Sequence, residues 1–366
     1  YEIKENKENN TIEITINVKE GEKMYIPDKG ITINGLKAFT QDAIKGKMET
    51  SEAKFLVSGT FKEDVFQKDL KKIISYYNSE GFVNAKIVSY DIKYDDLKEK
   101  IFLTINLDEG DQYKFGEVKV EVGDEKIFTP DKVKEKFTLK QGDIFSEETY
   151  KRDLDRVKFI YSEKGYIGAN ILDTKNFDAE KKLISINLKV NEGKVFYISG
   201  VQIDGNYKTK DYVVKRELLV KQGEPFDGDK IRRSSERIYN LGFFEDVNIN
   251  LLPGKDSDSR ILIFNVKERQ TGQLQLGAGY STLDGLTGFL QVSENNLFGE
   301  GRRIAAKWEF GAQRQNYELS FLEPYFLGEP ISLGASIYKL LRAYYVTYKD
   351  ERIGGNARLG ISSGEN

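Results

Sequence analysis

A strand that ends in an acidic glycine turn recurs along this chain at the interval of one small domain. Residues 11–21 read TIEITINVKEG, residues 100–110 read KIFLTINLDEG, and residues 182–193 read KLISINLKVNEG. The turn glycines Gly21, Gly110 and Gly193 are therefore 89 and then 83 residues apart. A fourth copy, RILIFNVKE, ends at Glu268 without the glycine. Self-similarity at a fixed period indicates a tandem array of one structural unit.

A second landmark keeps the same period. Helical segments end in a glycine followed by an aromatic residue, at Gly81-Phe82, Gly165-Tyr166 and Gly242-Phe243. Glycine can adopt the left-handed conformation that ends a helix, and the aromatic residue then opens a strand. The preceding helices carry apolar residues at helical spacing, which are Leu70, Ile73, Ile74 and Tyr77, then Leu154, Val157 and Ile160, then Ile231 and Ile238.

The last unit can be read from end to end. We expect a strand over 196–203, helices over 209–219 and from 228, and strands over 244–251 and 260–267. Thr209 and Asp227 are suitable N-caps for the two helices. The order β-α-α-β-β predicts an α+β module with two helices on one face of a three-stranded sheet. The expected domains are the end of a preceding unit at 1–21, then complete units at 22–110, 111–193 and 194–270, then a different region at 271–366.

Each such sheet has exposed edges. An edge can accept a strand from a partner through backbone hydrogen bonds, or its charged side chains can simply block pairing. The sequence leaves both interpretations open.

After Glu268 the pattern changes from helical periodicity to strict alternation. In 273–280 (QLQLGAGY) the residues Leu274, Leu276, Ala278 and Tyr280 share one face, and Gln273, Gln275, Gly277 and Gly279 share the other. Strands are expected at 272–281, 286–293, 302–311, 316–322, 331–340 and 352–362. Their length is near the nine to eleven residues that a tilted membrane strand needs. Aromatic residues gather near strand ends, as in interfacial girdles, at Tyr280, Phe298, Trp308, Tyr325, Phe326, Tyr344 and Tyr345.

These features favour an antiparallel transmembrane β-barrel over a soluble β-sandwich, which alternates in the same way. Six strands are fewer than the eight that the smallest membrane barrels use, so we expect a barrel that is incomplete or is completed by something else. The start of the chain has no basic, apolar leader, so we expect it to begin inside a domain.

The composition excludes several function classes. The chain has no Cys and no His, which removes disulfides, thiolate nucleophiles, the Ser-His-Asp triad and the commonest metal ligands. Its formal charge of −3 argues against a nucleic-acid partner. No run approaches the length of a transmembrane helix. We expect no enzyme activity, no catalytic residues, no metal site and no cofactor.

At this point the motifs resemble a known family. Residues 198–247 (ISGVQIDGNYKTKDYVVKRELLVKQGEPFDGDKIRRSSERIYNLGFFEDV) resemble the POTRA domain next to the barrel in outer-membrane assembly proteins of the BamA kind. VKER at 266–269 resembles the passage into the first barrel strand. NNLFGEG at 295–301 and EPYFLG at 323–328 resemble the first two periplasmic turns. The residues of the likeness that we single out are Gly242, Phe243, Phe244, Glu323, Pro324, Tyr325 and Phe326.

The resemblance implies a protein that inserts β-barrel proteins into the outer membrane, with its POTRA repeats in the periplasm. It implies three partners, which are unfolded client proteins, accessory periplasmic lipoproteins and outer-membrane lipid. It also implies that the first strand acts as a lateral gate that pairs with a client strand, formed here by Gly272, Gln273, Leu274, Gln275, Leu276, Gly277, Ala278, Gly279 and Tyr280. The glycines would weaken this strand's pairing, although they could equally relieve crowding inside the barrel.

Two departures from the family pattern bear on this implication. Gln222 stands where such proteins often carry a carboxylate for lipoprotein docking, so the residues implied in docking are Gln222, the nearby Glu224, Arg216 and Glu217. The family's late lid-loop motif does not occur in this chain. Other hypotheses are a TamA-like or two-partner secretion pore of the same superfamily, and a soluble periplasmic POTRA scaffold.

Overall fold

The computed structural model describes residues 2–6, 11–15, 23–55, 57–97, 99–123, 127–282, 284–344 and 348–361. The chain divides into two compact units, Tyr1–Val157 with Ile171–Asn191 and Lys158–Asn170 with Glu192–Asn366. A short antiparallel hairpin of β1 (Glu2–Asn6) and β2 (Thr11–Thr15) comes first. The rest of the strand-and-turn segment predicted in residues 11–21, including its turn glycine Gly21, lies outside the described residues.

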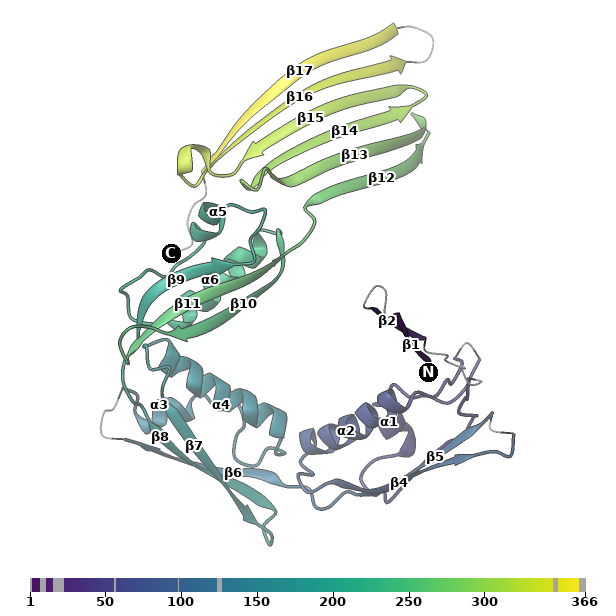
Figure 1. Ribbon diagram of the computed structural model, residues 1–366, viewed down its shortest axis with the longest axis vertical. Coiled ribbons are helices and arrows are strands. Elements are labelled where there is room, and N and C mark those ends of the chain that lie inside the picture. Colours follow the sequence, from purple (N-terminus) through teal and green to yellow (C-terminus); the bar gives the residue numbers. More distant parts are fainter. Residues whose placement is uncertain are drawn as a thin grey trace. The chain divides into compact units, whose positions relative to one another are not determined.

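Three β-α-α-β-β modules follow, as the repeat predicts (Figure 1). The first consists of β3 (Ile31–Asn34), α1 (Gln41–Lys45), α2 (Glu63–Ser79), β4 (Lys86–Tyr94) and β5 (Ile101–Asp108). The second consists of β6 (Lys114–Val122), α3 (Pro130–Lys134), α4 (Glu147–Ser162), β7 (Asn170–Asp178) and β8 (Leu183–Asn191). The third consists of β9 (Tyr197–Asp204), α5 (Asp211–Lys215), α6 (Gly228–Asn240), β10 (Phe244–Pro253) and β11 (Ser259–Glu268).

Each module has the same sheet. The last strand is central, the first pairs with it in parallel, and the fourth element occupies the other edge, giving the orders β3-β5-β4, β6-β8-β7 and β9-β11-β10. The long helix packs on one face, and its glycine terminator has a positive φ of 88° at Gly81, 89° at Gly165 and 75° at Gly242. In the third module the core includes Val214, Ile231, Ile238, Phe244 and Phe264, all buried.

One helix differs from the sequence prediction. The segment expected as a helix over 209–219 is helical only over α5, and its N-cap is Lys210, without a side-chain capping bond. The Thr209 hydroxyl makes no capping bond and instead accepts a hydrogen bond from Asn296, as described below. The second helix begins as predicted, with the Asp227 side chain accepting from the backbone nitrogens of Asp229 and Lys230.

The C-terminal region is one antiparallel sheet of six strands in chain order (Figure 1). Its strands are β12 (Gly272–Ser281), β13 (Gly285–Leu297), β14 (Arg302–Gly311), β15 (Arg314–Glu323), β16 (Ile331–Tyr344) and β17 (Tyr348–Ile361). A single 3-10 turn, η1 (Phe326–Gly328), lies between β15 and β16. Tyr345 and Ser362, which the sequence analysis included, lie outside the described residues. No helix among the residues that the structure describes is long and apolar enough to cross a membrane.

Candidate functional site: the edge strand and its junction with the last repeat

Strand β12 is an edge of the six-stranded sheet. It pairs with β13 in unbroken antiparallel register from Gly272↔Glu294 to Ser281↔Gly285. Within the described part of the chain no strand pairs with its other side, which therefore presents a row of backbone donors and acceptors. All nine residues of the predicted gate strand lie in β12. Leu274, Leu276 and Tyr280 are 66%, 74% and 77% exposed.

The glycines of β12 are not equivalent. A methyl group on Gly277 would lie 2.2 Å from Cε1 of Phe289, the residue opposite it on β13. A methyl group on Gly279 would have its nearest neighbour at 3.9 Å, which is ordinary contact. Among the described residues, relief of crowding therefore accounts for Gly277 and not for Gly279.

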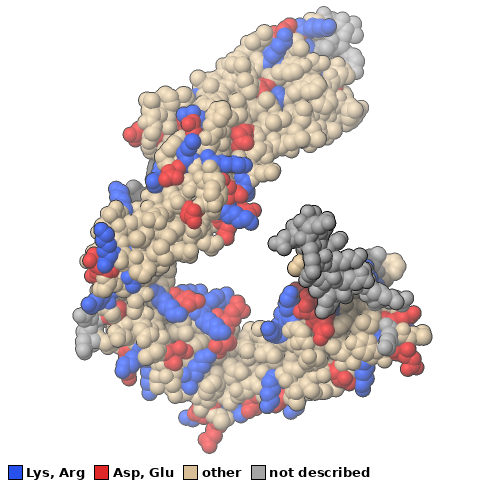
Figure 2. Space-filling model, in the orientation of Figure 1, with Lys and Arg blue, Asp and Glu red and all other residues tan. Residues whose placement is uncertain are grey.

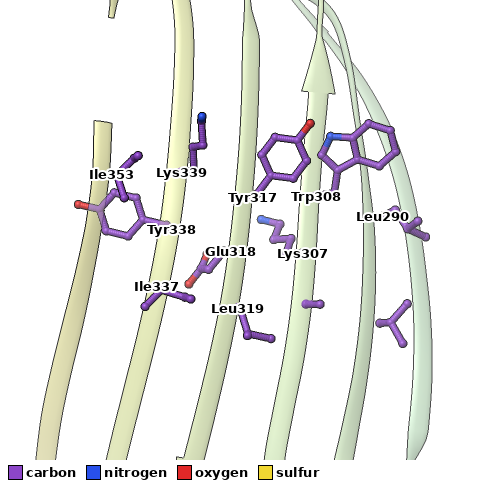
Figure 3. Close-up of a pocket in the computed structure, with 12 residues that line it drawn as sticks. Leu290, Lys307, Trp308, Tyr317, Glu318, Leu319, Ile337, Tyr338, Lys339 and Ile353 are labelled. Atoms are coloured by element: carbon purple, nitrogen blue, oxygen red, sulfur yellow. The ribbon is translucent and has the colours of Figure 1, made fainter. Parts of the chain in front are cut away.

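The two faces of this sheet differ in chemistry. On one face the register joins Leu276, Leu290, Trp308, Tyr317, Lys339 and Ile353 in a row, next to a row of Leu274, Val292, Ala306, Leu319 and Ile337. Trp308 lies beside Tyr317 on this face (Figure 3). Their ring centroids are 6.1 Å apart with the rings stacked, and both residues line a groove of about 440 Å³. The one lysine of these rows, Lys339, is neutralised by Glu351 at 2.6 Å.

The opposite face is polar. Its corresponding row is Gln275, Gln291, Lys307, Glu318 and Tyr338. Space-filling Figure 2 shows that charged side chains cover the repeats densely, whereas the visible face of the β12–β17 sheet carries few of them.

A turn of the sheet rests on the last repeat. The Asn296 side chain donates from Nδ2 to the Thr209 hydroxyl at 2.9 Å, and its Oδ1 accepts from the backbone nitrogen of Gly301 at 2.8 Å. The backbone nitrogen of Lys210 donates to the Gly299 carbonyl at 2.9 Å. Gly299 has a φ of 75°, and a methyl group there would lie 1.9 Å from the Lys208 carbonyl oxygen. The turn after β13 and the loop before α5 are thus in close backbone contact.

A carboxylate also holds the loop before α5 in place. Glu268 accepts hydrogen bonds from the backbone nitrogens of Lys208 and Thr209, the latter at 2.7 Å. Glu109, at the same place in the first repeat, accepts from the backbone nitrogens of Lys37 and Ala38 and from the Tyr77 hydroxyl. In the first and last repeats, the acidic residue at the end of the central strand therefore holds the loop after the first strand. The recurrence of this acidic residue in the sequence is the signal that could have predicted this role.

The four residues implied in accessory docking lie in two places. Arg216 stacks on the Tyr325 ring, with Cζ 3.8 Å from the ring centroid, and Glu217 accepts from the Tyr325 hydroxyl at 3.0 Å. Burial, and then the charge of Glu217, raise the pKa of the Tyr325 hydroxyl. Gln222 instead is exposed in the loop before α6, next to Glu224, which pairs with Lys230 at 3.4 Å.

The motif residues divide between core and junction. Phe243 and Phe244 are buried in the last repeat, beside the helix terminator Gly242. Glu323 pairs with Arg302, and Phe326 is partly exposed in the turn that Pro324 and Tyr325 begin. Among the described residues no group of three or more acidic side chains is placed to hold a metal ion.

Tandem β-α-α-β-β repeats that lead directly into an antiparallel sheet with one apolar face define a class of outer-membrane protein. The POTRA family, described as "Surface antigen variable number repeat", matches residues 29–110, 113–193 and 196–269. The Omp85 superfamily domain matches residues 296–366. The chain belongs to the POTRA-containing Omp85 family.

Curated relatives agree. A "Putative outer membrane protein assembly factor" of Treponema pallidum is 30% identical over 88% of this chain and 39% of its own length. "Outer membrane protein assembly factor BamA" of Nitratidesulfovibrio vulgaris is 30% identical over 96% of this chain and 45% of its own length. The protein of the same name from Neisseria meningitidis is 29% identical over 90% of this chain and 42% of its own length. The chain thus spans less than half of these relatives' length.

A solved structure supports the fold. The crystal structure of BamA from Haemophilus ducreyi lacking POTRA domains 1–3 aligns with 68% of this chain and 47% of its own, at a TM-score of 0.59 and 24% identity. The β12–β17 sheet is part of an outer-membrane barrel, and the repeats lie in the periplasm. The predicted fold class is confirmed, and the soluble-sandwich alternative is wrong. The apolar face of the sheet is the one that faces lipid.

Proposed function

We propose that the protein inserts β-barrel proteins into the outer membrane, without enzymatic chemistry. The relatives named as assembly factors support this proposal. In it, unfolded clients bind the repeats, and β12 offers its free edge to a client strand. Forming the client's backbone hydrogen bonds and burying its apolar face would supply the free energy, so no nucleotide or cofactor is needed.

The observation that carries the proposal is that β12 is the first strand of the barrel sheet and, among the described residues, is paired on its β13 side alone. Its inner side is held in register by β13, so an added strand would meet a template of fixed geometry. Gly279 has room for a side chain that it does not carry, and a glycine there weakens the strand's own packing. An edge that is ordered but weakly packed suits temporary pairing with a partner.

Disulfide cross-linking during assembly tests this directly. Gln275→Cys on β12 is expected to cross-link to a cysteine in a terminal strand of a client, in a fixed register. Gln291→Cys is a matched control, because Gln291 lies opposite Gln275 on the interior strand β13. Equal cross-linking at the two positions would contradict the template role of β12.

Depletion of the full-length protein separates assembly from secretion. An insertase predicts the loss of many outer-membrane barrel proteins. A TamA-like or two-partner secretion pore predicts the loss of one exported passenger or a few proteins, with the other barrels retained.

We also propose that accessory lipoproteins dock at the exposed loop of Gln222 and Glu224. Arg216 and Glu217, which were grouped with them in the sequence analysis, are better placed to hold the repeat against the sheet. Glu224→Lys should then reduce co-purification of such partners while leaving the protein folded. We keep the domain boundaries at 21/22, 110/111, 193/194 and 270/271 as part of the same proposal.

A further inference from the structure

A pocket of about 670 Å³ lies where the last repeat meets the β15–β16 turn. Its lining includes a charged and polar group, Tyr212, Arg216, Glu300, Arg302 and Glu323, and an apolar group, Phe321, Phe326, Leu327 and Leu333. The two groups adjoin, because Glu323 and Leu333 lie opposite each other on neighbouring strands. A pocket with this division suits a ligand that is itself amphipathic.

The two arginines that line the pocket differ in their hydrogen-bond and ion-pair partners. Arg302 forms ion pairs with both Glu300 and Glu323. Arg216 donates no hydrogen bond to any residue that the structure describes, and its Nε is buried without an acceptor. The nearest carboxylate oxygen, on Glu217, is 3.6 Å from that nitrogen, which is too long for a hydrogen bond. A guanidinium with unused donors is suited to the oxygens of a phosphate.

Counting Glu217, whose carboxylate lies 3.6 Å from Arg216, three glutamates face two arginines, so the formal charge of the site is −1. A bound anion would add to this negative charge, whereas a zwitterion would not. Glu300 is the more exposed of the two lining glutamates, with a side-chain exposure of 29% against 12% for Glu323. It can therefore pair with an ammonium group while Arg216 contacts a phosphate.

The apolar lining residues of the strands lie on the lipid-facing side of the sheet. Phe321 lies opposite Ala335 and two residues from Leu319, on the apolar face described above. On β14 the same face runs from Arg302 to Phe310, and eight residues extend about 27 Å along a strand. With a strand tilt of about 40°, this spans about 20 Å across the membrane, close to the height of an apolar barrel band. The aromatic cluster of Trp308 and Phe310 marks one end of that band, and the pocket marks the other, at the periplasmic headgroup level.

The lining residue Leu327 also indicates contact with lipid. It is 86% exposed and is held in the turn with a φ of 57°. An apolar side chain fixed outward at this level gains free energy from contact with acyl chains.

We propose that this pocket binds a phospholipid with a zwitterionic phosphoethanolamine headgroup. Its phosphate contacts Arg216, its ammonium contacts Glu300, and its acyl chains lie along Leu327, Leu333 and Phe321. The bound lipid links the last repeat to the membrane surface beside the barrel.

The test uses the full-length protein, purified in an uncharged detergent and stripped of lipid. Native mass spectrometry measures binding of dioleoyl phosphatidylethanolamine, dioleoyl phosphatidylglycerol and inorganic phosphate in separate titrations. Arg216→Lys and Leu327→Asn change the pocket. Arg303→Lys, on the opposite face of β14, and Phe298→Asn, exposed in another turn, are the matched controls.

We expect phosphatidylethanolamine to bind the parent about tenfold more tightly than either pocket variant. In Arg216→Lys a lysine cannot contact the phosphate in the bidentate way, and in Leu327→Asn the apolar contact with the acyl chains is lost. Both controls should bind like the parent. Parent-like binding by Leu327→Asn, whose exposed position makes misfolding irrelevant, would overturn the proposal. So would phosphatidylglycerol binding as tightly as phosphatidylethanolamine, or inorganic phosphate displacing the lipid, which would indicate an ion site only.

Discussion

The Glu268 carboxylate lies 2.7 Å from the backbone nitrogen of Thr209, whose hydroxyl in turn accepts a hydrogen bond from Asn296. The last residue of the final repeat strand is thereby connected to the turn after β13. Only three residues separate Glu268 from the start of β12. One carboxylate thus fixes both the point where the chain leaves the repeat and the loop on which the sheet rests.

Loss of this carboxylate should destabilise the last repeat. Glu268→Gln keeps the shape but removes the charge from its hydrogen bonds, and we expect a cost of about 1–2 kcal/mol in the free energy of unfolding. Glu109→Gln should cost more, because Glu109 is buried and its carboxylate also accepts a hydrogen bond from the Tyr77 hydroxyl. Urea unfolding of the POTRA segment measures both. Glu245→Gln, which affects only an exposed pair with Lys267, is the control and should cost less than about 0.5 kcal/mol.

The glycines of β12 should respond differently to alanine. Gly277→Ala places a methyl group against the Phe289 ring, so we expect weaker β12–β13 pairing and lower assembly activity. Gly279→Ala has space and should leave the β12–β13 pairing intact. Heat-modifiable gel migration of the full-length protein, together with client levels in the membrane, provides the measurement. If crowding is the cause, Phe289→Leu should restore Gly277→Ala; failure to restore would point to the backbone instead.

Alkaline pH should destabilise the second repeat through Tyr161. Its burial, and then the charge of Glu192, raise the pKa of this phenol to about 12, against an ordinary value of 10.0. Between these values the native state holds a proton that the unfolded chain has lost, so stability is complete below about pH 10 and falls as pH rises toward 12. Burial also raises the pKa values of Tyr77 and Tyr150, which act in the same direction.

Urea midpoints of the POTRA segment at pH 7, 9 and 11 test this prediction. Tyr161→Phe should unfold with a smaller decrease between pH 9 and 11 than the parent. The interval from pH 7 to 9 is the internal control, because this phenol is protonated in both states there. An unchanged decrease in the variant would show that other groups dominate.

Sequence periodicity was enough to predict the repeat, its element order and the six strands. Strand alternation and helical spacing are set by residues close to one another in the sequence, so a short window of sequence is enough to recognise them. The glycine terminators were predictable for the same reason, since only a residue tolerant of positive φ ends each long helix there.

Contacts between distant segments were not predictable in this way. Thr209 looked like a helix cap because its local context fits one, but a carboxylate 59 residues away and an amide 87 residues away use its polar groups. Arg216 and Glu217 looked like a docking pair on a helix, and their partner Tyr325 is more than 100 residues further along the chain. Such pairs follow from the tertiary fold, so no local pattern indicates them.

The Asn296–Thr209 bond should therefore set how firmly the turn rests on the repeat. Thr209→Val removes the hydroxyl and leaves a buried amide without its acceptor, at an expected cost of about 1–3 kcal/mol. Asn296→Ala removes the amide and also frees the Gly301 N–H, so it should cost at least as much. If the two residues act through their mutual bond, the double variant should cost clearly less than the sum of the single variants. Proteolysis of the full-length protein near residues 296–301 measures opening of the turn. Additive effects would mean that the backbone contact between Lys210 and Gly299 holds the junction by itself.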